Sequence, residues 1–202
     1  MKLVCLDLEG VLVPEIWIEL SKKTGIDELK LTTRDIPDYD QLMKQRIAIL
    51  EREKITLSDI QQVISLMDPL SGALEFVMKL RTLTQLIILS DTFEEFGKPL
   101  MAKLQWPTLF CNDLIVNPNT NMIKDYRLRQ QDGKLKAVKA FQSIGMQVFA
   151  AGDSYNDLSM IKQANKGLFF RPPQKIIDEN KEIGVALSHS ELLTQIEAFL
   201  QS

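Results

Sequence analysis

The stretch MKLVCLDLEG, residues 1–10, joins a largely apolar run to two carboxylates. Its residues 2–8 are continuous in apolar character, which is typical of a strand covered on both faces of a parallel sheet. Similar runs follow at residues 85–90, 147–151 and 167–170. Segments with apolar residues at helical spacing separate them, at residues 75–83, 94–104 and 134–144. This β-α-β alternation predicts an α/β fold, a Rossmann-like doubly wound parallel sheet.

The interval between the first two strands is too long for a simple crossover, at about seventy-five residues, and most of it has helical character. Pro14 suits a helix start, and Thr56 with Asp59 forms a capping pattern before another apolar face. We therefore predict a small α-helical cap at residues 14–69, inserted into a core of residues 1–13 and 70–202. Residues 111–128 read as a hairpin-like excursion.

The composition of the chain excludes several classes of function. The 202 residues include 45% hydrophobic and 25% charged residues with a net charge of −3, so a nucleic-acid partner is not expected. No long uncharged stretch suggests a signal peptide, and no apolar run reaches the ~18 residues of a membrane span. We expect a cytoplasmic protein with Cys5 and Cys111 as reduced thiols. With His189 as the lone histidine, a zinc site built from His and Cys is not expected.

Asp7 and Glu9 lie where the first strand stops, at the edge of an open α/β sheet where ligands bind. If the strand continues through them, both side chains point to the same side. Two close carboxylates need a shared proton or cation, which indicates a hard metal or acid-base chemistry. Simple solvation of a strand end is the open alternative.

Residues 150–157, AAGDSYND, again follow an apolar strand and precede a helix expected to start near Leu158. Gly152 permits a tight turn, and Asp153 and Asp157 offer hard oxygen ligands. Helix capping would explain one acid here, but two acids and Asn156 exceed that need, which favours a functional role.

The third polar strand end is Ser90-Asp91, which we expect to enter a helix. A hydroxyl and backbone N–H groups at the N-terminus of that helix would cradle a phosphate, although a plain helix cap at Ser90 is a serious alternative and the signal is weak alone. Lys134 opens a later helix and could be merely solvated. Together these strand ends match phosphoryl transfer, in which Mg²⁺ bridges phosphate and protein oxygens.

Two residues of the cap extend this set. Arg46 falls in the middle of an apolar helix face, where an unpaired buried charge is costly and a partner is required. That partner is either a structural glutamate or a substrate carboxylate held by a bidentate guanidinium. Glu15, just after Pro14, could simply favour the helix dipole. We assign Trp17 and Met43 to packing, and we expect Ser190 to cap the last helix, with no catalytic part for His189.

The ordered motifs Asp7-x-Glu9-Gly-Val, Ser90, Lys134 and Gly152-Asp153-x-x-x-Asp157 resemble those of the haloacid dehalogenase superfamily and span the core. The resemblance implies that Asp7 is the nucleophile and that Mg²⁺ is bound by Asp7, the Glu9 carbonyl and Asp153. It also implies that a phosphate is held by Ser90, Asp91, Lys134 and Asn156, with Asp157 in support.

Family phosphatases usually carry Asp where this chain has Glu9, and the extra methylene is a shift that positioning-dependent chemistry can feel. The segments CLDLEGVLVPEIW, TTRDIPDYDQLMKQR, ILSDTF and AAGDSYND resemble a small subgroup of phosphoserine phosphatase-like enzymes that also transfer phosphate to homoserine. By this resemblance Glu9 is the acid and base, Arg46 binds the substrate carboxylate and Glu15 the ammonium. The implied partners are O-phosphoserine, with homoserine or water as acceptor.

Other readings stay open at this point. They are a phosphatase of another small phosphomonoester, a non-catalytic phospho-acceptor module and, less favoured, a dehalogenase, which would need neither Glu9 nor the acidic cluster. Homodimerisation is also left open.

Overall fold

The computed structural model describes residues 1–33, 35–36 and 38–202, and it contains one seven-stranded sheet in the order β4-β3-β2-β1-β5-β6-β7. Arg34 and Pro37, which belong to the stretch TTRDIPDYDQLMKQR, lie outside the described residues. The strands are β1 (Lys2–Leu6), β2 (Gln85–Phe93), β3 (Thr108–Val116), β4 (Ile123–Arg127), β5 (Gln147–Gly152), β6 (Lys166–Phe170) and β7 (Gly184–Ala186). All neighbours pair in parallel except β3 and β4, which form an antiparallel hairpin. The α/β doubly wound sheet predicted from the sequence is confirmed.

The chain changes direction across the sheet at β1, which pairs with β2 on one side and β5 on the other. Leu6 lies opposite both Ile88 and Ala151 in these ladders. At such a switch point the loops after two neighbouring strands diverge to opposite faces and leave a crevice at their carboxyl ends. The topology therefore places the residues after β1, β2 and β5 around one crevice.

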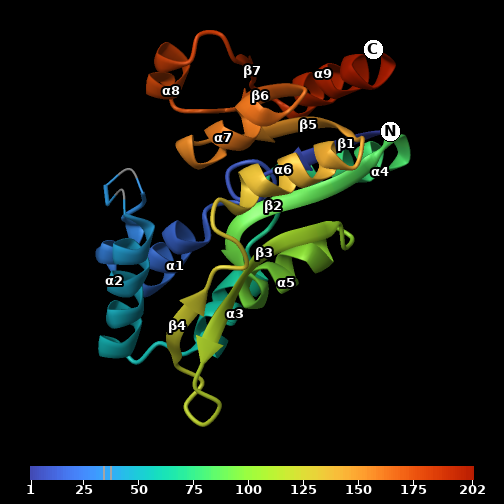
Figure 1. Cartoon of the computed structure of the whole chain (residues 1–202). Coiled ribbons are helices and arrows are strands. Elements are labelled where there is room, and N and C mark those ends of the chain that lie inside the picture. Colours follow the sequence, from blue (N-terminus) through green and yellow to red (C-terminus); the bar gives the residue numbers. More distant parts are fainter. Residues whose placement is uncertain (34, 37) are drawn as a thin grey trace.

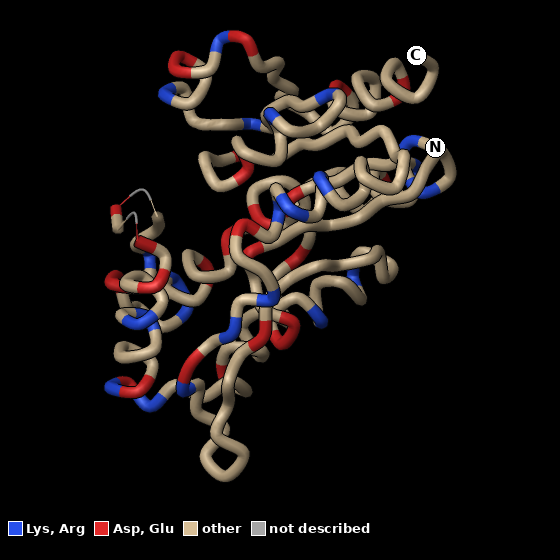
Figure 2. Tube along the Cα trace, in the orientation of Figure 1, with Lys and Arg blue, Asp and Glu red and all other residues tan. Residues whose placement is uncertain are grey.

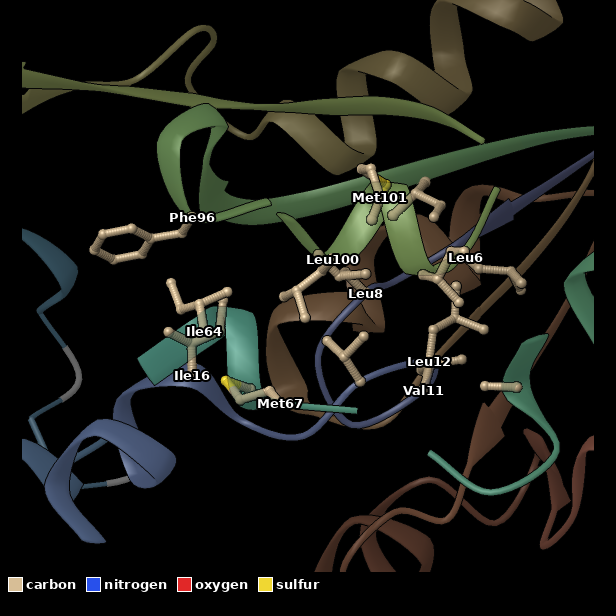
Figure 3. Close-up of a cluster of buried hydrophobic side chains, with 14 of the residues drawn as sticks. Leu6, Leu8, Val11, Leu12, Ile16, Ile64, Met67, Phe96, Leu100 and Met101 are labelled. Atoms are coloured by element: carbon tan, nitrogen blue, oxygen red, sulfur yellow. The ribbon is translucent and has the colours of Figure 1, made fainter. Parts of the chain in front are cut away.

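Helices cover both faces of this sheet (Figure 1). One face carries α4 (Ala73–Leu83), α5 (Glu94–Lys103) and α9 (His189–Gln201), and the other carries α6 (Gly133–Ser143), α7 (Tyr155–Gln163) and α8 (Gln174–Glu179). The first cluster continues under the loop after β1, where Leu8, Val11 and Leu12 pack with side chains of α5 (Figure 3). Burial of this loop fixes the backbone on which Asp7 and Glu9 lie.

The insertion between β1 and α4 is helical, as expected. It comprises α1 (Ile16–Thr24), the short 3-10 helix η1 (Asp27–Lys30), α2 (Tyr39–Arg52) and α3 (Leu57–Leu66). Thr56 and Asp59 form the predicted capping box at the start of α3. Figure 1 shows α1 and α2 standing beside the carboxyl ends of the strands. We keep the name cap for residues 14–69, whose boundaries stay a prediction.

The β3–β4 hairpin, expected at residues 111–128, supports this cap from the core. The Tyr126 hydroxyl donates to Asp40 at 2.8 Å, and Lys124 pairs with Glu51. At the tip, the Asn121 side chain accepts from the Ser58 backbone N–H at 2.8 Å. These contacts bind the cap helices α2 and α3 to the hairpin.

Four boundaries differ from the sequence expectations. Strand β1 ends at Leu6, so Asp7 and Glu9 lie in a loop and strand alternation does not align them. Strand β2 continues to Phe93, and α7 begins at Tyr155 rather than near Leu158. Ser188, not Ser190, caps α9. Among the described residues, no helix is both long and apolar enough to cross a membrane.

Candidate active site

A buried network of charges joins the ends of β1 and β5 to the start of α6. The backbone N–H of Asp7 donates to Ala151 at 3.0 Å, which continues the β1–β5 ladder by one residue. The Lys134 ammonium lies 3.0 Å from Asp7 Oδ1 and 2.7 Å from Asp157 Oδ1. Asp91 completes the group at 3.6 Å. The expectation that Lys134 could be merely solvated is wrong, because its side chain is only 7% exposed.

The charges in this network shift one another's pKa values. Burial and the neighbouring Asp157 raise the pKa of Asp7 well above its ordinary value, although Lys134 opposes the rise. Burial by itself would lower the pKa of Lys134, but Asp157, Asp7 and Asp91 raise it well above the ordinary value. Lys134 therefore stays charged, and further positive charge near Asp7 would favour its ionised form.

Asp157 is fully buried and acts through its neighbours. Its Oδ2 accepts from the backbone N–H groups of Asp153 and Ser154 at 3.0 and 3.1 Å, and its Oδ1 from Lys134. A Cβ on Gly152 would lie 2.1 Å from the Asp157 carboxyl carbon, so only glycine admits this packing. Asp157 thus fixes the turn that presents Asp153.

The donor set fits a divalent cation. Asp7, Asp153 and Asp157 each offer a carboxylate oxygen, and these oxygens lie within 4.8 Å of one another. Gly10, at φ +75°, leaves the space beside Asp153, because a Cβ there would come within 2.5 Å of its carboxyl carbon. Three carboxylates against one lysine leave excess negative charge, which suits Mg²⁺. The sequence had proposed Asp7, the Glu9 carbonyl and Asp153, and the geometry adds Asp157 to the cluster.

Ser90 and Asp91 lie inside β2, four and three residues before α5 begins. The two expectations that Ser90 caps a helix and that a helix N-terminus cradles phosphate there are wrong, since Phe93 holds the N-cap position. Ser90 is buried, and its Oγ accepts from the Thr92 N–H at 3.2 Å. The strand continues because β3 still pairs with it, with a register shift between Leu89 and Phe93.

The backbone at Asp91 is held by side chains that the sequence did not single out. Its carbonyl oxygen accepts from the Tyr39 hydroxyl and from Asn112 Nδ2, both at 3.1 Å. Asn112 is 6% exposed, and its Oδ1 also accepts from the backbone N–H of Arg129 at 3.1 Å. No local spacing could reveal these partners, because they come from α2 and β3.

Glu9 reaches from the β1 loop to the cap. Its Oε2 accepts from the Ile16 N–H at 2.8 Å, at the start of α1. Burial, and then the charge of Glu15, raise the pKa of Glu9 to about 8. A carboxyl in this state is protonated at neutral pH and can give a proton to an oxygen in the crevice.

Arg46 lies on α2 and is buried, with 7% of its surface exposed. Nη2 donates to the Leu31 carbonyl oxygen at 2.8 Å, and the guanidinium lies 4.5 Å from the centroid of the Trp17 ring. Among the described residues, no carboxylate lies within 4 Å of it, so the expected alternative of an Arg–Glu structural bridge is wrong. Burial lowers the pKa of Arg46 to about 10, which still leaves it charged at neutral pH.

Two neighbouring cavities divide the crevice. The cap-side cavity, about 430 Å³, is lined by Glu9, Glu15, Arg46, Asp153 and Asn156, among others. The lysine-side cavity, about 270 Å³, is lined by Ser90, Lys134 and Arg129. Tyr39, Asp91 and Asn156 border both. Figure 2 shows acidic segments gathering at this edge of the sheet, beside the helices of the cap.

These cavities are lined by most of the site residues chosen from the sequence, whereas Asp7 and Asp157 belong to the buried charge network and line neither cavity. Glu15 occupies the N-cap position of α1 and lines the cap-side cavity. Trp17, assigned to packing, lines the same cavity. His189 lies away from both cavities, bonded to the Val11 carbonyl oxygen at 2.8 Å.

Comparisons with known proteins agree with this architecture. The family model of haloacid dehalogenase-like hydrolases matches residues 1–165. Phosphoserine phosphatase ThrH of Pseudomonas aeruginosa is 51% identical over 95% of this chain and 93% of its own length. A phosphoserine phosphatase of Pseudomonas syringae pv. tomato is also 51% identical, over 95% of this chain and 81% of its own. A solved phospho-aspartyl intermediate analogue of phosphoserine phosphatase shares the fold, with a TM-score of 0.76 at 21% identity over 96% of this chain and 98% of that one.

Proposed function

The chain belongs to the haloacid dehalogenase-like hydrolase family, and on that premise we propose that it is a Mg²⁺-dependent phosphoserine phosphatase that also transfers phosphate to homoserine. The observation that carries this proposal is the cap-side cavity, where Glu9 faces the same space as Glu15 and Arg46. A carboxylate and a buried guanidinium in one cavity match the ammonium and carboxylate of an amino acid. The names of the two relatives support the same substrate.

In the first step Asp7 attacks the phosphorus in line, and the bond from phosphorus to the serine oxygen breaks. Glu9 gives its proton to that oxygen, so serine leaves as the neutral alcohol. Ser90, Lys134, Asn156 and the backbone of Asp91 hold the phosphate. Mg²⁺ held by Asp7, the Glu9 carbonyl and Asp153 would neutralise part of the charge on these oxygens.

In the second step an acceptor hydroxyl attacks the phosphorus of the aspartyl-phosphate. Glu9, now ionised, takes the acceptor's proton, and the bond from phosphorus to Asp7 breaks, which restores the starting enzyme. Water as acceptor gives inorganic phosphate. Homoserine carries the same α-carboxylate and α-ammonium as serine, so Arg46 and Glu15 would hold it once serine has left.

The test is incubation of the protein with phosphoserine and Mg²⁺, with and without homoserine. We expect many turnovers of phosphate release per chain, and phosphohomoserine when homoserine is added. Absence of turnover would contradict the phosphatase, and release of at most one phosphate per chain would indicate a phospho-acceptor module instead. Phosphate release without any phosphohomoserine would contradict the transferase alone.

A further inference from the structure

Among the described residues, the groups in contact with the buried guanidinium of Arg46 are neutral. Trp17 lies under its face at 4.5 Å, the Leu31 carbonyl oxygen accepts from Nη2, and Met43 Sδ lies 3.8 Å from Nη1. Nε is buried and has no hydrogen-bond acceptor among the described residues. A buried N–H donor without an acceptor is costly, so this edge of the guanidinium is suited to a ligand oxygen.

The type of group that holds the Arg46 guanidinium determines which of its N–H donors stay without an acceptor. An aromatic ring attracts a cation through its π face and makes no hydrogen bond to the in-plane N–H groups. A carboxylate would bind those same N–H groups, usually two at a time, and would compete with any ligand. Trp17 therefore restrains the guanidinium without occupying the edge that a carboxylate ligand needs.

Trp17 is itself fixed from the core. Its side chain, on α1, packs edge-to-face against Phe96 of α5, with ring centroids 5.7 Å apart. Phe96 in turn packs edge-to-face against Phe93, at the end of β2, at 5.6 Å. Trp17 is 8% exposed, and this exposed part borders the cap-side cavity. A chain of aromatic contacts thus connects the core to the guanidinium of the cap.

We propose that Trp17 is a positioning residue for carboxylate recognition, which orients the Arg46 guanidinium by its face and leaves the buried Nε without a protein acceptor, so that it can donate to the α-carboxylate of the substrate. The inference rests on the proposed function, because it assigns how that site selects amino-acid phosphates. A ring that merely fills the core would affect all substrates equally.

The experiment compares O-phosphoserine with O-phosphoethanolamine, which keeps the phosphate and the ammonium but lacks the carboxylate. In Trp17→Leu the cation–ring attraction is lost, and we expect kcat/KM for phosphoserine to fall about tenfold relative to phosphoethanolamine, through KM rather than kcat. Trp17→Phe keeps a weaker ring, and we expect a selective loss of about threefold. If Trp17→Leu does not fold, Trp17→Phe still tests for a selective loss with phosphoserine.

The matched control is Trp106→Leu, because Trp106 is the second of the two tryptophans and is 59% exposed, outside both cavities that form the crevice. It should leave the ratio of the two kcat/KM values unchanged. Equal losses for both substrates in the Trp17 variants, or no loss, would overturn the proposal.

A binding measurement separates this inference from the proposed function. Trp106→Leu leaves Trp17 as the lone tryptophan, and we expect its fluorescence to respond to L-serine but not to ethanolamine. If the wild-type chain fails to hydrolyse phosphoserine, the proposed function is contradicted. The fluorescence titration still tests whether Trp17 takes part in binding the carboxylate of serine. The same response to both ligands, or none to serine, would overturn the role of Trp17.

Discussion

On the core side of the crevice, around Lys134, buried charges form ion pairs with one another, whereas on the cap side the described residues offer Arg46 no carboxylate within 4 Å. In the core, Lys134 lies within 3.6 Å of three carboxylates, those of Asp7, Asp91 and Asp157. In the cap, Arg46 is equally buried, yet its neighbours are an indole, a thioether and a carbonyl oxygen. The difference indicates that protein carboxylates already compensate the charge of Lys134 before a phosphate binds, while the charge of Arg46 is available to a carboxylate ligand.

The largest effect should follow from Asp7→Asn on the core side. The amide cannot act as the nucleophile, so we expect kcat to fall by about 10⁴-fold or more. The measurement is phosphate release from phosphoserine, with Asp125→Asn, an exposed acid of β4, as the matched control. Activity of Asp7→Asn within tenfold of the control would contradict a covalent role for Asp7.

Lys134→Met should destabilise the fold strongly, because it leaves buried carboxylates without their cation. Breaking a buried ion pair from one side costs about 3–5 kcal/mol, and urea unfolding would measure the loss. Adding Asp157→Asn to this variant removes one of the stranded charges and should recover part of the stability. A loss no larger than that of the exposed control Lys136→Met would show that the network is not needed for stability.

Arg46→Met should have the opposite effects, a small loss of stability and a large loss of substrate binding. Since no ion pair is broken, we expect the free energy of unfolding to change by no more than about 1 kcal/mol. The KM for phosphoserine should rise about 100-fold, while that for phosphoethanolamine stays near the wild-type value, because a lost charge-assisted bidentate contact affects only the carboxylate. Destabilisation as large as in Lys134→Met would remove the contrast between the two sides.

The smallest effect concerns His189, which holds the loop after β1 through a hydrogen bond with the Val11 carbonyl oxygen. Burial lowers the pKa of His189 below its ordinary value, so the unfolded chain binds a proton more readily. Stability from this residue is therefore complete above about pH 6.5 and is lost as the pH falls toward the lower pKa of the folded state. Unfolding of the wild type and of His189→Gln at pH 7.5 and 5 should show a modest extra loss for the wild type; equal losses would contradict the lowered pKa.

The sequence predicts the core side of the crevice better than the cap side. Asp7, Lys134, Asp153 and Asp157 lie just after strand ends or in the first turn of helices, so hydrophobic runs and local spacing were enough to single them out. Parallel strands bring their carboxyl ends to one edge, which makes this part of the site readable from the chain.

The cap side is less readable, because its contacts join residues that are distant in sequence. The stacking of Trp17 on Arg46 and the bond from Tyr39 to the Asp91 carbonyl oxygen depend on how helices pack. Helical periodicity placed Arg46 on an apolar face but could not show that the groups in contact with its guanidinium are neutral. The strand boundaries at Leu6 and Phe93 were also missed, since pairing with neighbouring strands determines them.

The central claim, that phosphate passes through Asp7, is tested most directly by acid quenching during turnover of ³²P-labelled phosphoserine. We expect label on the peptide that contains Asp7, at no more than one phosphate per chain, and none in Asp7→Asn. Label on another residue, or steady turnover with no labelled enzyme at any time, would contradict the account.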